Sequence, residues 1–179
     1  VSFVKGLDPA RPITAGCNEP NSGNHLFRSG VLDVIGYNYH NKDIPNVPAN
    51  FPDKPFIITE SNSALMTRGY YRMPSDRMFI WPERWDKSFA DSTFACSSYE
   101  NCHVPWGNTH EESLKLVRDN DFISGQYVWT GFDYIGEPTP YGWPARSSYF
   151  GIVDLAGFPK DVYYLYQSEW TDKQMLHLF

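Results

Sequence analysis

Four apolar runs along the chain predict β-strands. They are rich in β-branched and aromatic residues and are bounded by turn-forming Pro, Gly, Asp and Asn. Their apolar residues are nearly continuous rather than alternating, which is typical of strands covered on both faces, as in a parallel sheet. The predicted strands are Arg11–Cys17, Leu32–Tyr39, Pro55–Glu60 and Phe122–Phe132.

Helical patterns lie between and after these strands. The clearest is Thr109–Arg118, which has Glu111 and Glu112 in its first turn, where carboxylates favour the helix dipole. A second helix is predicted at Lys160–Trp170, directly after a proline. The order of strands and connecting segments predicts βα units and therefore an α/β fold.

The connection from about residue 61 to residue 121 is the longest in the chain. Its first part, Ser61–Pro105, combines aromatic and basic side chains with several Pro and Ser residues. A long aromatic loop after the carboxyl end of a strand is where an α/β barrel builds its substrate site. The side chains concerned are Arg68, Tyr70, Tyr71, Arg72, Trp81 and Trp85.

Composition narrows the classes of function. The 179 residues are 41% hydrophobic and 20% charged, which is typical of a globular domain rather than a disordered chain. A formal net charge of -6 argues against nucleic acid as a partner, because phosphate binding needs a cationic face. Aromatic residues reach 17%, and their rings stack on sugars as well as filling cores. No apolar stretch approaches the ~20 residues of a membrane span.

The three cysteines form an odd set. Cys96 and Cys102 are near enough in sequence to pair across a loop, whereas Cys17 lies far from both. The spacing of a metal site is absent, and separate buried thiols are the favoured interpretation.

Glu60 is the first candidate for chemistry. It ends the apolar run of Pro55–Glu60, and in α/β sheets the carboxyl ends of the strands face the ligand. The alternative is a carboxylate that only caps a strand or forms a salt bridge.

Several motifs then resemble glycoside hydrolase family 2, which includes β-galactosidases, β-glucuronidases and β-mannosidases. Lys54–Asn62 (KPFIITESN) resembles the nucleophile strand of that family, and Gly125–Tyr134 (GQYVWTGFDY) looks like its last barrel strand. The stretch from Gly136 to Gly151 is similar to bacterial β-galactosidase-like members, and Asp154–Tyr164 resembles the entry to the final helix. These motifs occur in the family's order and cover essentially the whole chain.

The resemblance implies a partial (β/α)8 TIM barrel. The four predicted strands would be strands five to eight with their helices, so residues 1–179 would be the C-terminal part of the catalytic domain without strands one to four. We expect the rest of the barrel and flanking β-sandwich domains as partners. Self-association through the exposed edges of strands five and eight is an alternative.

The resemblance also implies roles for three aromatic or acidic residues. Glu60 would be the nucleophile at the end of strand seven. Tyr39, at the end of strand six, would hydrogen-bond this nucleophile or simply be a buried aromatic residue. Trp129, at the end of strand eight, would form the floor beneath the sugar or pack in the core.

Four further polar residues are candidates for contacts with sugar hydroxyls. Asp133 and Glu137 follow Trp129 in the chain and would bind hydroxyls or fix the loop. Asn38 and Asn62 are polar neighbours of Tyr39 and Glu60 and would serve the same purpose.

The acid/base carboxyl group of the family is expected upstream of Val1. Asn18-Glu19-Pro20 looks like an acid/base signature, but Glu19 precedes Glu60 by too few residues for two intervening βα units, so a loop after strand five is expected. The isolated chain is therefore predicted to be inactive. No cofactor is expected, and the residues that bind the family's divalent cation would also lie upstream. Localisation cannot be read from the sequence, although a periplasmic or extracellular enzyme is the expectation for a bacterial glycan-degrading protein.

The resemblance favours a retaining exo-β-glycosidase, in the first place a β-galactosidase. A β-glucuronidase is the alternative within the family, because Arg68, Arg72 and Arg146 offer cations for a sugar carboxylate. A non-catalytic carbohydrate-binding fragment is the alternative from another class.

Overall fold

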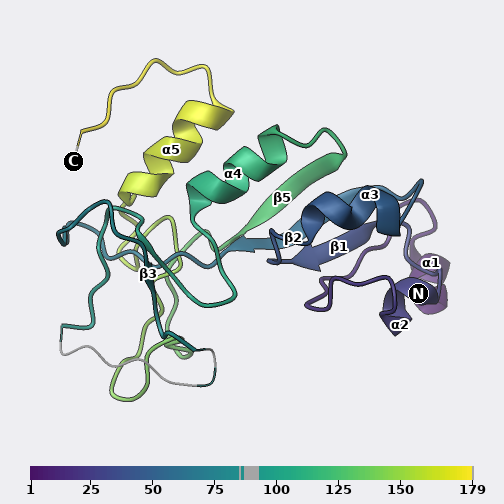
Figure 1. The fold of residues 1–179 in the computed structure, drawn as a ribbon, viewed down its shortest axis with the longest axis horizontal. Helices are drawn as coiled ribbons and strands as arrows, with labels where there is room; N and C mark the ends of the chain where they lie inside the picture. Colours follow the sequence, from purple (N-terminus) through teal and green to yellow (C-terminus); the bar gives the residue numbers. More distant parts are fainter. Residues whose placement is uncertain (85, 87–92, 179) are drawn as a thin grey trace. The chain divides into compact units, whose positions relative to one another are not determined.

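The computed structural model of the chain describes residues 1–84, 86 and 93–178 (Figure 1). Trp85, one of the aromatic residues noted in the long connection, lies outside the described residues. The chain divides into two compact units, each built from two segments. The first unit consists of Val1–Ser61 and Ser113–Val128, and the second unit consists of Asn62–Glu112 and Trp129–Phe179. No helix in the described part of the chain is long and apolar enough to span a membrane.

The first unit is built on a three-stranded sheet with the order β1-β2-β5. β1 (Ile35–Asn38) and β2 (Phe56–Asn62) lie side by side and run parallel (Figure 1), with Ile35 opposite Phe56 and Tyr37 opposite Ile58. β5 (Ile123–Trp129) pairs with the other side of β2. The predicted parallel pairing of the second and third apolar runs is confirmed.

Aromatic residues form much of the core around this sheet. Tyr37 and Phe56 meet edge-on at 5.1 Å between ring centroids, and Phe27 and Phe51 do so at 5.0 Å. Such edge-to-face pairs add to the free energy of burying the rings. Four short helical segments belong to this unit: α1 (Ser2–Leu7), α2 (His25–Arg28), the 3-10 helix η1 (Ile44–Asn46) and α3 (Val47–Asn50).

The first predicted strand, Arg11–Cys17, is reduced to a single bridge. Cys17 forms a parallel bridge to Tyr37, and residues 11–16 form no strand pairing. Pro12 has no N–H to donate to a ladder, which disfavours regular pairing here. The segment still runs beside β1, because the Ile13 carbonyl accepts the N–H groups of Asp33 and Val34.

The strand β5 differs from the prediction in its burial. All four residues of β1 are buried, as expected for a strand covered on both faces, but in β5 only Ile123 is buried. Tyr127 is 65% exposed. The sequence predicted that this strand is covered on both faces. The described residues do not cover β5 in this way.

The helix predicted at Thr109–Arg118 is confirmed as α4 (His110–Arg118). Thr109 and Glu112 form a capping box: the Thr109 Oγ1 accepts the Glu112 N–H at 3.2 Å, and Glu112 Oε2 accepts the Thr109 N–H at 3.0 Å. Leu116 and Val117 pack against the core of the first unit.

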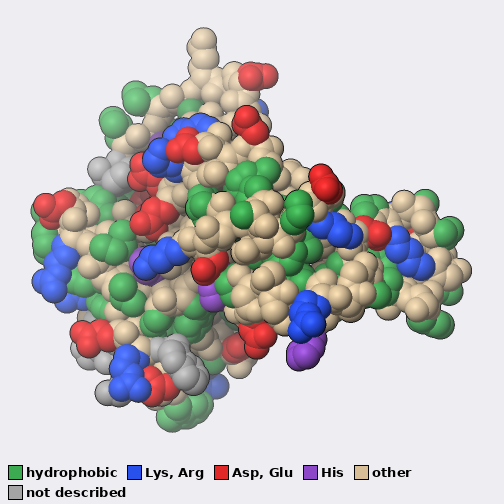
Figure 2. All heavy atoms as spheres, turned by 45° about the vertical axis from the view of Figure 1, so that its right-hand side comes forward, with side chains coloured by type: hydrophobic (Ala, Val, Ile, Leu, Met, Phe, Trp, Pro, Cys, Tyr) green, Lys and Arg blue, Asp and Glu red, His purple; other side chains and the backbone are tan. Residues whose placement is uncertain are grey.

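The second unit holds most of the long connection. Among its described residues, the regular elements are a short parallel pair, β3 (Phe79–Ile80) with β4 (Cys102–His103), and the helix α5 (Asp161–Trp170), which confirms the second predicted helix. Most of the other described residues of this unit are irregular, and a second hydrophobic core there includes Leu65, Val104 and Phe150. On the face drawn in Figure 2, acidic and basic side chains are interspersed and form no continuous basic patch.

Candidate active site

Glu60 lies near the carboxyl end of β2, as predicted. The pairing of β1 with β2 is regular up to Tyr37 and Ile58 and then shifts, so that Asn38 lies opposite Glu60. Thr59 is the extra residue of this irregularity, and its hydroxyl donates to Asn38 Oδ1 at 2.7 Å. A bulge of this kind re-aims the side chains that follow it.

Tyr39 and Glu60 are brought together by the ends of two neighbouring strands. The Tyr39 N–H donates to the Glu60 carbonyl at 2.6 Å, and the Tyr39 hydroxyl donates to Glu60 Oε2 at 2.7 Å. Tyr39 has a φ of 55° and His40 a φ of 59°, so the chain turns sharply as it leaves β1. The turn lets one residue bind both the backbone and the carboxylate of Glu60.

Asn38 is buried beside Tyr39 and Glu60, and Gly16 leaves room for its side chain. A Cβ atom on Gly16 would lie only 2.6 Å from Asn38 Oδ1, so the residue at position 16 has to be glycine if this packing is kept. The Asn38 Oδ1 already accepts the Thr59 hydroxyl. Contact between Asn38 and a sugar stays a prediction.

Glu19 lies on an exposed loop between the Cys17 bridge and α2. This matches the expectation that the Asn18-Glu19-Pro20 motif belongs to a loop.

The other predicted site residues belong to the second unit. Trp129 is half-buried, packs edge-on against Tyr134 at 5.9 Å and accepts the Ser63 N–H through its carbonyl at 3.3 Å. Glu137 is exposed on the loop that follows. Both placements are compatible with the predicted contacts to sugar, which remain predictions.

Asp133 is buried in an ion pair that the sequence did not predict. Its Oδ1 accepts the Gly151 N–H at 2.8 Å and the Lys160 ammonium at 2.7 Å. Lys160 also donates to the carbonyls of Met66 and Tyr149, at 2.7 and 3.2 Å. Burial raises the pKa of Asp133 and lowers that of Lys160, so the cost of desolvation exceeds the effect of their mutual attraction.

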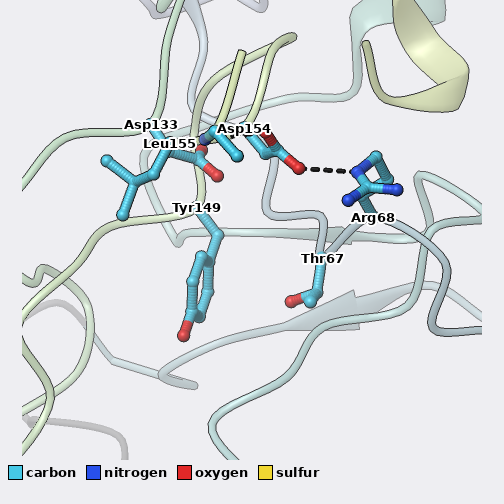
Figure 3. Close-up of a pocket in the computed structure, with 7 residues that line it drawn as sticks. Thr67, Arg68, Asp133, Tyr149, Asp154 and Leu155 are labelled. Atoms are coloured by element: carbon cyan, nitrogen blue, oxygen red, sulfur yellow. Dashed lines mark hydrogen bonds and ion pairs between the residues drawn. The ribbon is translucent and has the colours of Figure 1, made fainter. Parts of the chain in front are cut away.

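Asp133 also lines a pocket of about 230 Å³ in the second unit (Figure 3). Across this pocket, Arg68 Nε donates to Asp154 Oδ2 at 2.6 Å, and the Arg68 guanidinium lies 4.7 Å from the centre of the Phe158 ring. One of the three arginines considered for a sugar carboxylate is therefore already neutralised by an acidic partner.

Asn62 lies in a buried polar cluster with two residues that the sequence did not single out. Its amide donates to the Tyr166 hydroxyl at 3.2 Å, and that hydroxyl lies 2.7 Å from His110 Nδ1. Burial lowers the pKa of His110 to about 3, so the imidazole is neutral at neutral pH. The exposed fraction of Asn62 is only 1%, and its contact with a sugar hydroxyl stays a prediction.

Glu100 is a further buried carboxyl group. It accepts the His110 N–H at the first turn of α4, where the free N–H groups favour an acceptor. Burial nevertheless raises its pKa to about 8. No sequence signal marks Glu100 or His110, because their burial depends on residues distant in the chain.

No family model matches the chain. The chain is 98% identical over all of its residues to the beta-galactosidase BoGH2A of Bacteroides ovatus and covers 21% of that protein. It is 32% identical over 99% of its length to a putative beta-glucuronidase of Formosa agariphila, of which it covers 18%. Among solved structures, a beta-glycosidase from Bacteroides vulgatus matches 99% of the chain with 31% identity and a TM-score of 0.78, and the chain covers 24% of it.

These comparisons confirm the resemblance of the sequence to glycoside hydrolase family 2. The homologues are glycoside hydrolases of that family, and the structural likeness implies an enzyme that contains a TIM barrel. The chain spans about a fifth of the length of the curated relatives that it matches.

Proposed function

We propose that this segment supplies the nucleophile of a retaining exo-β-galactosidase, and that Glu60 is this nucleophile. The hydrogen bond of 2.7 Å between the Tyr39 hydroxyl and Glu60 Oε2 carries the proposal, because it holds a carboxylate at the carboxyl end of a parallel strand pair. The 98% identity to the beta-galactosidase of Bacteroides ovatus supports the specificity.

The proposed reaction is a double displacement. The ionised Glu60 attacks the anomeric carbon while a second carboxylic acid protonates the leaving oxygen, and water then hydrolyses the glycosyl ester with that second group as base. In retaining enzymes the two carboxyl groups lie about 5–5.5 Å apart. The proposed steps use two carboxyl groups and water, and no cofactor is proposed for residues 1–179; a divalent cation is possible in the full-length enzyme.

The order of the strands supports assigning the sheet of the first unit to the second half of the barrel. The bridge at Cys17 and the strands β1, β2 and β5 follow one another in space in the same order as in the sequence. A (β/α)8 barrel has the same sequential order of strands. We therefore assign these four segments to strands five to eight, and Trp129, at the end of β5, to the floor of the sugar site.

The second carboxyl group is proposed to come from outside these 179 residues. Glu19, which carries the acid-like motif, is exposed on a loop, and the sequence places it too near Glu60 in the chain. A polypeptide of these residues alone is therefore expected to show no hydrolysis, since losing the general acid costs about 10²–10⁴-fold in rate.

Galactoside is favoured over glucuronide as the substrate. The identity to a beta-galactosidase carries this preference. Of the three arginines considered for a sugar carboxylate, Arg68 is held by Asp154 at 2.6 Å, whereas Arg72 and Arg146 lie over aromatic rings. Glucuronide hydrolysis remains the alternative, because a relative with 32% identity is described as a putative beta-glucuronidase. Hydrolysis of aryl galactoside, glucuronide and mannoside by the full-length enzyme separates these specificities.

Covalent trapping tests the role of Glu60 directly. The full-length enzyme is incubated with an activated 2-deoxy-2-fluoro-β-galactoside, whose fluorine slows release of the glycosyl-enzyme more than its reactive leaving group slows formation. Peptide mass spectrometry should find the sugar on Glu60 and on no other residue.

Two variants complete the test. Glu60→Gln should lose nearly all activity on an aryl galactoside, whereas Glu19→Gln should keep wild-type activity. A label on a different carboxylate, or an active Glu60→Gln enzyme, would refute the assignment. If the chain belongs instead to a non-catalytic sugar-binding protein, Glu60→Gln leaves the affinity for galactosides unchanged and no covalent product forms.

A further inference from the structure

Two buried thiols lie side by side in the core of the second unit. Cys96 and Cys102 are 0% and 1% exposed, and both belong to the same hydrophobic cluster. All three cysteines of the chain are buried free thiols in the structure, but Cys96 and Cys102 share one cluster instead of lying separately, as the sequence favoured. Cys17, the remaining one, lies in the first unit.

The backbone brings Cys96 and Cys102 to neighbouring positions beside one short segment. The Cys102 carbonyl accepts the Leu65 N–H at 2.8 Å, and the Cys96 carbonyl accepts the Thr67 N–H at 3.0 Å. Leu65 and Thr67 are two positions apart, so their N–H groups lie at most about 7 Å from each other. Disulfides join residues whose Cα atoms are about 4.4–6.8 Å apart.

The side chains also face one another. Hydrogen bonding to the Cys96 thiol, together with burial, raises the pKa of Cys102. The Cys96 sulfur lies 2.7 Å from the Tyr141 hydroxyl, and Tyr141 is itself in contact with the same cluster. Both thiols are therefore directed into one small space beside a single tyrosine.

We propose that Cys96 and Cys102 are a disulfide-forming pair, oxidised when the protein folds in the presence of a small-molecule disulfide or a dithiol oxidase. One S–S bond forms and two S–H bonds are lost. The two electrons and two protons pass to the oxidant, whose own disulfide becomes two thiols.

The disulfide would close a short loop that already connects several parts of the second unit. Within it, the Ser98 N–H donates to the Tyr70 carbonyl at 2.7 Å, and Glu100 accepts an N–H at the start of α4. The bond would therefore fix the loop against the segment that follows β2 and against the first turn of α4. Its main effect is expected on unfolding, because a cross-link restricts the unfolded chain.

Peptide mapping of the full-length enzyme tests the pair. The enzyme is produced once in a reducing cytoplasm and once in an oxidising periplasm, then denatured and alkylated without reductant. In the periplasmic protein we expect one peptide pair joined through Cys96 and Cys102, lighter by two hydrogen atoms than the reduced pair. Cys17 should carry the alkyl label in both preparations and is the internal control.

Thermal unfolding gives the second measurement. The periplasmic wild-type enzyme should have a higher midpoint than the cytoplasmic one, and added reductant should abolish the difference. Cys96→Ala and Cys102→Ala should show no difference between the two preparations. Full alkylation of both residues in the periplasmic enzyme, or a bond from either of them to another cysteine, would overturn the proposal even if the alanine variants fail to fold.

Discussion

The buried ion pair between Asp133 and Lys160 allows a quantitative prediction. Their side chains are 5% and 1% exposed, and the Lys160 ammonium donates to one carboxylate oxygen and two carbonyls. Lys160→Met keeps the apolar length of the side chain but removes all three donors. Asp133 would then keep the Gly151 N–H, at 2.8 Å, as a donor to a buried negative charge.

The magnitude follows from the burial of both partners. Removing one partner of a buried pair costs about 3–5 kcal/mol, because an uncompensated charge is left in the interior. At about 2–4 °C per kcal/mol for a domain of this size, the midpoint of thermal unfolding should fall by roughly 10 °C. Because burial raises the pKa of Asp133 and lowers that of Lys160, the pair as a whole stabilises little.

This reasoning makes a second variant informative. Asp133→Asn combined with Lys160→Met removes both charges and keeps an acceptor for the Gly151 N–H. The double variant should therefore regain at least half of the loss in midpoint. Differential scanning calorimetry of the full-length enzyme measures both changes.

The control is an exposed pair of the same residue types. Lys115 and Asp119 are 65% and 46% exposed, and Lys115→Met should change the free energy of unfolding by less than about 1 kcal/mol. The reasoning is refuted if the unfolding midpoint of Lys160→Met lies within about 2 °C of the wild-type midpoint, a shift that corresponds to a loss of at most about 1 kcal/mol. It is equally refuted if the double variant is less stable than the single one.

Three further predictions concern activity, packing and pH. Tyr39→Phe should lower kcat/KM on an aryl galactoside by about 10–100-fold, since a hydrogen bond to a charged group contributes about 1.5–3 kcal/mol. Gly151→Ala should strongly reduce the yield of folded enzyme, measured by gel filtration, because the new Cβ would lie 2.1 Å from the backbone nitrogen of Asp133. Burial raises the pKa of Glu100 from its ordinary value of 4.5 to about 8, so folding takes up a proton between these values. The midpoint of unfolding should therefore fall as the pH rises through this range, Glu100→Gln should remove that slope, and Glu169→Gln, at an exposed position of α5, should not.

The elements with the strongest local signals could be predicted from the sequence. The runs that form β1 and β2 are apolar and bounded by turn residues. The capping box of α4 lies within four consecutive residues, Thr109 to Glu112. Arg11–Cys17 has a similar apolar composition, but it pairs with β1 only at Cys17. Pro12 has no N–H to donate to a ladder, and composition alone does not show this loss of pairing. The exposure of β5 could not be predicted from its own sequence, because the burial of a strand depends on which other segments pack against it.

The candidate site divides in the same way. The position of Glu60 at a strand end follows from the apolar run before it, and the role expected for Tyr39 came from the resemblance. The bulge at Thr59 and the left-handed backbone at Tyr39, which create the contact of 2.7 Å, have no local signature. The burial of Lys160 was missed because lysine is normally expected at the surface. The burial of His110 was missed because it depends on residues distant in the chain.

Each compact unit is made from two separate stretches of chain, joined at residues 61–62, 112–113 and 128–129. No single cut of the polypeptide therefore leaves both units whole. A cut after Ser61 separates the carboxylate of Glu60 from the second unit and removes the first unit's own C-terminal stretch. Split-protein reporters and domain-by-domain expression, which assume that a module is contiguous in the gene, are thus unsuited to this part of the enzyme.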